Sequence, residues 1–237
     1  MYFPRIRCNT FLHVFAALVL SSALATAAIP GLCNTGLATG CASLIVPGNG
    51  TTTDGNWQIA NPSPTEPSSA PIPNPCDLNC LLLVFEPAWV DTPDPSWEAD
   101  PVTFSATASQ WITPQVENNL GGQYIYETSF PVPTADAHVT ISGELLSDNE
   151  VYAIYISSGT SECIPVAGYP YDNAAVNSPS NFIPPATAFT ITKAPVTPGG
   201  TATLYFVVRN RGAGGIDTSP TSTGLRVNFS SKSAFSK

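Results

Sequence analysis

The sequence predicts an all-β protein, an antiparallel β-sandwich, on three observations. Its 24 prolines and 17 glycines disfavour long helices, because proline lacks the amide donor of a helix and clashes inside one. Charged residues make up 11% of the chain and methionine occurs once, whereas helical proteins are rich in Lys, Glu and Leu. Short apolar segments with a period of two residues recur between turn residues, which is typical of a sandwich or barrel.

The first 28 residues have the three parts of a secretory signal peptide. Arg5 and Arg7 give a basic start, an apolar stretch runs from Phe11 to Leu24, and small residues cluster at 23–28. Because a spanning helix needs about 20 predominantly apolar residues, we expect cleavage rather than a membrane anchor. We therefore expect a secreted mature domain, residues 29–237, with no membrane insertion after cleavage.

The mature domain is acidic. The full sequence has a formal net charge of −9, and loss of Arg5 and Arg7 makes the charge more negative. Such a chain repels phosphate backbones and anionic lipid surfaces, because binding them requires Lys and Arg. Nucleic acid is therefore not an expected partner.

The first elements follow from the apolar pattern of residues 57–113. Trp57–Ala60 reads as a strand fragment, and the prolines of 61–75 predict a loop with polyproline character inside a single domain. Leu81–Phe85 is a continuous apolar run, as in a strand buried on both faces. Ser109–Thr113 predicts a short strand that ends before Pro114. Trp57, Trp89 and Trp111 lie in such strand patterns and are expected in the core.

Alternation is more regular in the second half of the chain. Gln123–Phe130 places the side chains of Tyr124, Tyr126, Thr128 and Phe130 on one face of a strand. Asp148-Asn149, between two alternating segments, indicates a hairpin turn, and Pro198–Gly200 indicates another turn. The further alternating segments are Val139–Leu145, Val151–Ile156, Phe189–Thr192, Leu204–Val208 and Leu225–Phe229.

An odd number of cysteines remains after the signal, since Cys8 leaves with it. The remaining ones are Cys33, Cys41, Cys76, Cys80 and Cys163. We expect the local disulfides Cys33–Cys41 and Cys76–Cys80, each closing a short loop. Cys163 is then an unpaired thiol, free or intermolecular, although long-range pairs such as Cys41–Cys163 also fit. A zinc site at Cys76 and Cys80 is the rival interpretation, but no histidine lies near them.

Short motifs follow one another in a recognisable order from Cys33 to Phe229. They are Cys33–Gly36 (CNTG), Asn56–Ile59 (NWQI), Ala88–Val90 (AWV), Ser109–Ile112 (SQWI), Gly122–Phe130 (GQYIYETSF), Ile141–Gly143 (ISG), Asp148-Asn149, Leu204–Asn210 (LYFVVRN) and Thr223–Val227 (TGLRV). The succession resembles a family of exported jelly-roll domains that is similar to galactose-binding-like domains. The resemblance implies a single jelly roll of eight to ten strands, with ligand contacts in loops at one end, but no defined substrate.

No catalytic constellation stands out, and we expect a protein that is not an enzyme. His138, the one histidine after the signal, lies at the start of a predicted strand, and no G-x-S-x-G motif accompanies it. Two carboxylates could act in a glycan hydrolase, either among Glu144, Asp148 and Glu150 or among the acids of 91–100. Acids clustered in loops are usually solvated, so hydrolysis is an alternative to binding rather than the leading hypothesis.

Asp91, Asp94 and Asp100 are the candidate metal ligands. Calcium takes six to eight oxygens from carboxylates and carbonyls, and these acids are the densest group in the sequence. No cofactor is otherwise indicated.

The candidate ligand-binding residues are aromatic and polar side chains in loop-like segments. They are Trp97, Tyr169, Tyr171, Asp172 and Asn173. Aromatic faces stack on sugar C–H groups while Asp, Asn and backbone groups bond the hydroxyls. The sequence therefore favours a secreted, non-enzymatic, adhesive β-sandwich whose partner is a carbohydrate or another cell-surface component. A structural or assembly protein of an extracellular matrix or envelope is the other alternative, suggested by an unpaired Cys163.

Two sequons, at Asn49 and Asn228, would be glycosylated in a eukaryotic host.

Overall fold

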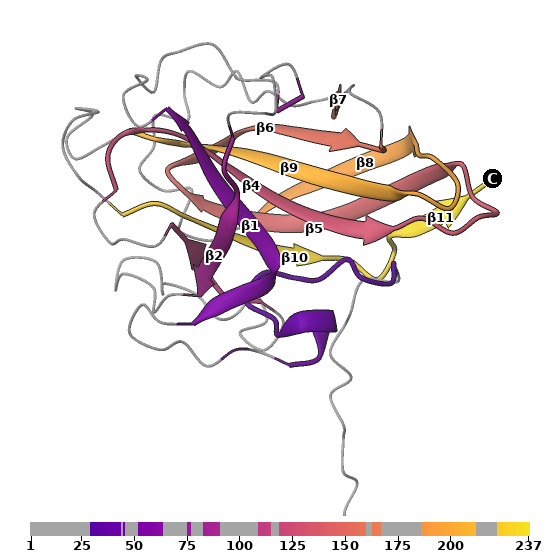
Figure 1. The fold of residues 1–237 in the computed structure, drawn as a ribbon, viewed down its shortest axis with the longest axis horizontal. Coiled ribbons are helices and arrows are strands. Elements are labelled where there is room, and N and C mark those ends of the chain that lie inside the picture. The colour runs from indigo at the N-terminus through magenta and orange to yellow at the C-terminus, as the bar shows by residue number, and fades with distance from the viewer. Residues whose placement is uncertain are drawn as a thin grey trace, which may run out of the picture.

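In the residues that the structure, a computed structural model, describes, the regular secondary structure is almost entirely β-strand (Figure 1). It describes residues 29–43, 45, 52–63, 75–76, 83–90, 109–114, 119–159, 163–166, 186–211 and 222–237, with the backbone alone at 61–63. The strands within these residues are β1 (Thr53–Ser63), β2 (Glu86–Val90), β3 (Ile112–Thr113), β4 (Gly122–Pro131), β5 (His138–Asp148), β6 (Glu150–Ser157), β7 (Cys163–Pro165), β8 (Thr187–Pro195), β9 (Thr201–Asn210), β10 (Gly224–Phe229) and β11 (Ala234–Ser236). A short 3-10 helix, η1 (Thr39–Cys41), precedes them.

The strands pair antiparallel in one continuous order, β11-β5-β10-β3-β2-β1-β4-β9-β6-β7, with β8 on β5. Strands β8, β5 and β10 form one layer, and β1, β4, β9 and β6 form the other. The short strands β3 and β2 join the layers along one side, which makes the sandwich barrel-like. In Figure 1, β1 and β2 cross the long strands at a steep angle. The predicted all-β antiparallel sandwich is confirmed.

The core lies between the two layers because each strand turns alternate side chains inward. The predicted inward face of β4 is confirmed, since Tyr124, Tyr126, Thr128 and Phe130 are all buried. Four aromatic rings from four strands meet at the centre: Trp57 (β1), Phe189 (β8), Phe206 (β9) and Phe229 (β10). Their centroids are 5.6 to 6.2 Å apart, so the two layers interlock through aromatic packing.

The segment before β1 is fixed to the last long strand by the CNTG motif. Asn34 Nδ2 donates to Asn228 Oδ1 at 2.8 Å, and Asn34 Oδ1 accepts from the Phe229 amide at 2.7 Å. Thr35 Oγ1 donates to Gln110 O at 2.6 Å and accepts from the Val227 amide at 3.0 Å. Gly36 has a positive φ of 73° in close contact with Gln110, which leaves no room for a side chain. The motif therefore closes one side of the sandwich.

The structure corrects several expectations about single elements. β1 continues to Ser63, so residues 61–63 of the expected proline-rich loop are strand. Residues 83–85 are not strand: Val84 is 73% exposed, and strand begins at Glu86. The predicted strand at 109–113 shortens to Ile112–Thr113, and β11 forms in the polar C-terminal segment. Of the three tryptophans expected in the core, Trp57 and Trp111 are buried and Trp89 is half-buried.

Asp148-Asn149 does not make the predicted hairpin. β5 pairs with β8, β10 and β11, whereas β6 pairs with β9 and β7. The chain therefore crosses from one layer to the other at Asn149. Asp and Asn favour a turn both in a hairpin and in a crossing between layers, so the dipeptide alone does not distinguish the two. The strands with which β5 and β6 pair show that this turn is a crossing.

Candidate functional site

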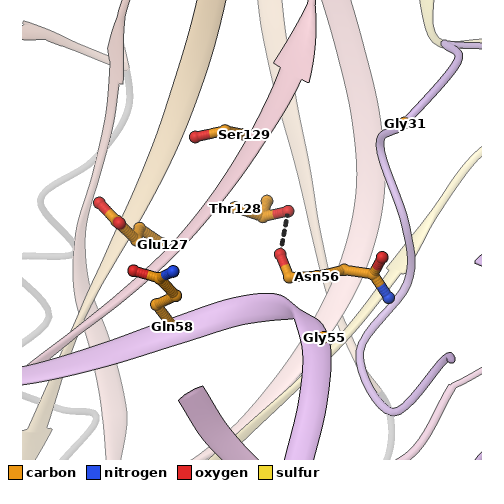
Figure 2. Close-up of a pocket in the computed structure, with 7 residues that line it drawn as sticks. All are labelled: Gly31, Gly55, Asn56, Gln58, Glu127, Thr128 and Ser129. Carbon is orange, nitrogen blue, oxygen red and sulfur yellow. Dashed lines mark hydrogen bonds between the residues drawn. The ribbon is translucent and has the colours of Figure 1, made fainter. Parts of the chain in front are cut away.

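A polar pocket of about 250 Å³ opens on the outer face of β1 and β4 (Figure 2). Its lining consists of Gly31, Gly55, Asn56, Gln58, Glu127, Thr128 and Ser129. Gln58 and Glu127 are direct cross-strand partners, and both point outward because their neighbours Trp57 and Tyr126 point into the core. An amide and a carboxylate therefore stand next to each other on a rigid sheet.

Glu127 has the most unusual electrostatics of the pocket. Partial burial raises the pKa of its carboxyl to about 7, because the charged form loses hydration. At neutral pH the group is therefore near its midpoint and can either accept or donate a hydrogen bond. Two residues further along β4, on the same outward face, Ser129 Oγ shares a hydrogen bond of 2.8 Å with Thr203 Oγ1 of β9.

The rim of the pocket is shaped by Asp54 and Asn56. The Asp54 carboxylate is fully buried and accepts from the amides of Gly36 at 2.6 Å and Asn56 at 2.8 Å. Asn56 Nδ2 donates to Leu37 O at 2.7 Å, and the Asn56 carbonyl accepts from Thr128 Oγ1 at 2.9 Å. Figure 2 shows the Asn56 side chain turned away from Gln58 and Glu127. The hydrogen bonds of Asn56 therefore stabilise the chain at the edge of the pocket, whereas the side chains of Gln58 and Glu127 remain available to a ligand.

Burial also raises the pKa of Asp54 to about 6, against hydrogen bonds from Asn56 and Gly36 that lower it. Its place beneath the rim and its full burial make Asp54 a structural group rather than a ligand contact.

Two tyrosines continue the row of Gln58 and Glu127 across the same face. Tyr205 of β9 lies opposite Glu127, and Tyr155 of β6 lies opposite Tyr205. Phe85 packs against Tyr205 with ring centroids 6.5 Å apart. Leu83, Phe85 and Cys76 contact an apolar cluster on this face, made of Ile125, Ala153, Tyr155, Cys163 and Val207. Cys76, Leu83 and Phe85 thus cover the part of the face next to the pocket.

The disulfides differ in part from the expected pairs. Cys33–Cys41 is confirmed. Cys76 pairs with Cys163 rather than with Cys80, so Cys163 is not an unpaired thiol, and Cys80 lies outside the described residues. The reason is the shared packing of Cys76 and Cys163 in the outer-face cluster, which brings two sequence-distant cysteines together.

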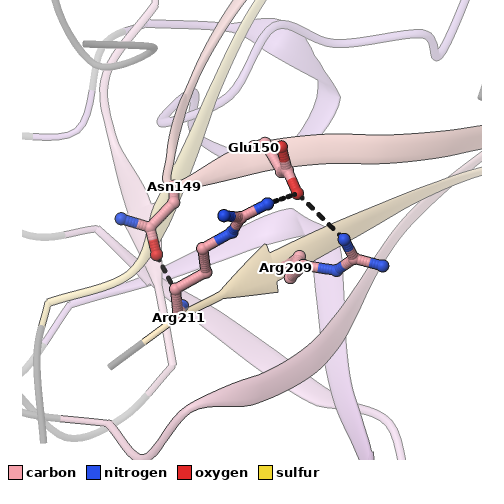
Figure 3. A network of polar contacts seen from close by, with 4 residues as sticks. All are labelled: Asn149, Glu150, Arg209 and Arg211. Atoms are coloured by element: carbon pink, nitrogen blue, oxygen red, sulfur yellow. Dashed lines mark hydrogen bonds and ion pairs between the residues drawn. The ribbon is translucent and has the colours of Figure 1, made fainter. Parts of the chain in front are cut away.

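Of the carboxylates considered for hydrolysis, Glu144, Asp148 and Glu150 do not line the pocket, and the acids of 91–100 lie outside the described residues. Glu150 Oε1 accepts from Arg209 and Arg211 (Figure 3), Asp148 is buried at the end of β5, and Glu144 lies in the opposite layer between β8 and β10. His138 is half-buried at the start of β5, the strand-edge position expected for it.

The other site residues expected from the sequence are not placed by the structure. Trp97, Tyr169, Tyr171, Asp172, Asn173, Asp91, Asp94, Asp100 and Asn49 lie outside the described residues. No group of three or more potential metal ligands is found in the part of the chain that is described. Asn228 is half-buried in β10, with its Oδ1 bonded by Asn34. These predictions therefore remain predictions.

Sequence reasoning missed Gln58 and Glu127. A signal for them was present, because Glu127 and Ser129 alternate with the inward residues of Gly122–Phe130, and Gln58 lies between Trp57 and Ile59. Strand alternation alone places all three outward. What it does not show is that β1 and β4 are neighbours with Gln58 in register with Glu127.

The fold and the site define a disulfide-stabilised, all-β antiparallel protein with a polar pocket on one sheet face. Its two described disulfides suggest an oxidising, extracellular environment. In the part of the chain that is described, no helix has both the length and the apolar character needed to cross a membrane. Neither a protein-family model nor a curated protein matches the chain. The resemblance to exported jelly-roll domains stays a prediction.

Proposed function

We propose that the protein is exported and binds a neutral glycan of an extracellular surface in the pocket of Gln58 and Glu127. The observation that carries the proposal is the register of β1 and β4, which sets an amide beside a carboxyl in one polar pocket. Adjacent sugar hydroxyls both donate and accept hydrogen bonds. The neighbouring amide of Gln58 and carboxyl of Glu127 together supply hydrogen-bond donors and acceptors, and Ser129 adds a hydroxyl.

The composition and size of the pocket support a neutral sugar. None of its seven lining residues is cationic, so an acidic sugar would find no charge partner there, and Glu127 would repel it when ionised. A volume of about 250 Å³ lies just below the usual range of small-molecule pockets, about 300 to 1,000 Å³, which suits one sugar unit of a longer chain. The site lies on strands rather than on loops, which favours precise positioning of hydrogen-bonding groups.

Two other functions have less support. An extracellular assembly protein was suggested by an unpaired Cys163, and that residue forms a disulfide with Cys76. A glycan hydrolase needs two opposed carboxyl groups, about 5 to 9.5 Å apart. Glu127 is the one carboxylate among the residues that line the described pocket. The raised pKa of Glu127 suits a general acid, but hydrolysis would still need a second carboxylate.

The test is a neutral-glycan array probed with the disulfide-intact protein, followed by calorimetric titration of the retained glycan. We expect Glu127→Ala to weaken binding by about 10- to 100-fold, the cost of a hydrogen bond to a charged group. The matched control is Glu144→Ala, which removes a half-buried strand glutamate from the other layer. Absence of any retained glycan, or equal binding by Glu127→Ala and the native protein, would overturn the proposal.

A further inference from the structure

Strand β1 is irregular where it borders the polar pocket. Thr53 pairs with Trp89 of β2 and Gln58 pairs with Pro87, so five steps along β1 correspond to two steps along β2. Residues 54–57 therefore form a β-bulge with more residues than the facing strand can pair. Such a bulge bends its strand and re-aims the neighbouring side chains, and bulges are common next to functional sites.

The carboxylate of Asp54 holds the bulge together. Its Oδ1 accepts from the Asn56 amide at 2.8 Å and from Asn56 Nδ2 at 3.2 Å, so the side chain closes a turn over Gly55. Its Oδ2 accepts from the Gly36 amide at 2.6 Å, which ties the bulge to the segment before β1. Because these partners are all N–H donors, they suit an ionised carboxylate, which only accepts.

The Asn56 side chain fixes the bulge to the same segment. Its Nδ2 donates to Leu37 O at 2.7 Å and to Ala38 O at 3.1 Å. Its Oδ1 accepts from the Gly40 amide at 3.1 Å. All three of these partners lie in the loop that the Cys33–Cys41 disulfide closes. The bulge is thus anchored on a closed loop through both of its polar side chains.

The bulge determines where the groups of the pocket stand. Gly55 and Asn56 belong to the bulge and line the pocket, and Gln58 is the first residue after it (Figure 2). Thr128 Oγ1 donates to the Asn56 carbonyl at 2.9 Å, so the bulge is also held to β4. A change in the bulge would therefore move Gln58 relative to Glu127.

We infer that Asp54 is a positioning residue for the polar pocket, which sets the place of Gln58 beside Glu127 through the bulge. Asp54 is fully buried and does not line the pocket, so it acts without touching the ligand. Hydrogen bonds to a sugar weaken steeply when donor and acceptor are misaligned, so the support beneath them affects affinity. The inference rests on the proposed glycan binding, because it names what holds that site in place.

The test compares the glycan affinity and the stability of folded variants at pH 8, above the pKa of about 6 that burial gives Asp54. We expect Asp54→Ala to weaken binding about 10-fold, the effect of one misplaced hydrogen bond. Asp54→Asn keeps an oxygen that can accept from the Asn56 amide, so its affinity should lie between those of Asp54→Ala and the native protein.

The matched control is Thr223→Val. Thr223 is buried, and its Oγ1 donates to Asp148 O at 2.6 Å, away from the pocket. This variant also loses a buried hydrogen bond, so we expect a lower Tm with an unchanged glycan affinity. A role of Asp54 in stability alone would give the same pattern in Asp54→Ala.

A second set of variants disturbs the bulge without altering Asp54, and it still decides if Asp54→Ala does not fold. A Cβ at Gly55 would collide with Thr39 Oγ1 of η1, so Gly55→Ala should displace the bulge and weaken binding about 10-fold. Adding Thr39→Ala removes that oxygen and should restore most of the affinity. A methyl group that simply blocked the pocket would not be rescued in this way.

The outcomes separate the inference from the proposed function. If the native protein binds no neutral glycan, both are refuted. If the native protein binds and folded Asp54→Ala binds equally well, the inference alone is refuted. The same follows if Gly55→Ala keeps the native affinity, or if Thr39→Ala does not restore the affinity that Gly55→Ala has lost.

Discussion

Cys76 and Cys163 are joined in a disulfide although 87 residues separate them. Cys163 belongs to β7, the last strand of the sheet order, and Cys76 contacts the apolar cluster that Leu83 and Phe85 also touch. The bond therefore ties Cys76, which precedes β2 in the chain, to the sheet face that bears the polar pocket. The loss of stability on removing this disulfide is the first prediction.

Replacing both Cys76 and Cys163 by Ser should lower the free energy of unfolding by roughly 4 to 5 kcal/mol, because the unfolded chain regains the entropy of a long open loop. The matched control is the Cys33→Ser and Cys41→Ser pair, whose separation is 8 residues. Its expected cost is roughly 2 to 3 kcal/mol by the same relation. Urea denaturation of both double variants measures the difference. An equal loss in the two would contradict the loop-length argument.

Asp54 should make the protein less stable as the pH rises from about 4 to about 6. Burial raises its pKa from 3.8 to about 6, so the folded state binds this proton more tightly than the unfolded state does. Stability is thus greatest below pH 4 for this group and falls as the pH passes through 6, by up to about 3 kcal/mol. Denaturation across this range measures the slope, and Asp54→Asn should reduce it. A slope unchanged in Asp54→Asn would assign the effect to other groups.

Glu127 should make the proposed glycan binding depend on pH near neutrality. Its pKa is about 7, and the ionised carboxylate accepts stronger hydrogen bonds from sugar hydroxyls than the neutral acid. We therefore expect the affinity to rise from pH 6 to pH 8, with protons released on binding. Titration calorimetry in two buffers of different ionisation enthalpy detects that release. Glu127→Gln should bind more weakly at pH 8 and show a flat profile, and a sloping profile in this variant would exclude Glu127 as the titrating group.

Phe206→Ala should cost about 3 to 5 kcal/mol of unfolding free energy, the range for loss of a large buried side chain. Phe206 is fully buried and contacts both Trp57 and Phe189, which belong to different layers. Phe235→Ala is the comparison, because Phe235 is only partly buried in β11. Thermal and chemical denaturation measure both. A smaller loss at Phe206 than at Phe235 would contradict the central role of the four-ring cluster.

Local patterns predict most of the strands but not their partners. Alternation identifies β4, β9 and β10 because each buries one face in the core, and it places Glu127 outward. It misplaces residues 83–85 of the apolar run 81–85, because an apolar run looks the same in a strand and in a segment packed over a sheet. Leu83 and Phe85 do pack on the outer-face cluster, and Val84 between them is exposed.

The site and the second disulfide could not be predicted because both depend on long-range pairing. Gln58 meets Glu127 only because β1 lies beside β4, and Cys76 meets Cys163 only through the outer-face cluster. Loop-closure entropy favours local cysteine pairs in a sequence argument, but tertiary packing overrides that preference here.

The bonds between Asn34 and β10 have a consequence for the order in which the protein is made. A ribosome synthesises Asn34 early, yet the amide that it accepts from belongs to Phe229, 195 residues later. Until then Ile29 and Leu32, both core residues, have no strand β10 to close over them. The growing chain therefore exposes these core residues until Phe229 has emerged, and a product that stops before β10 would remain open.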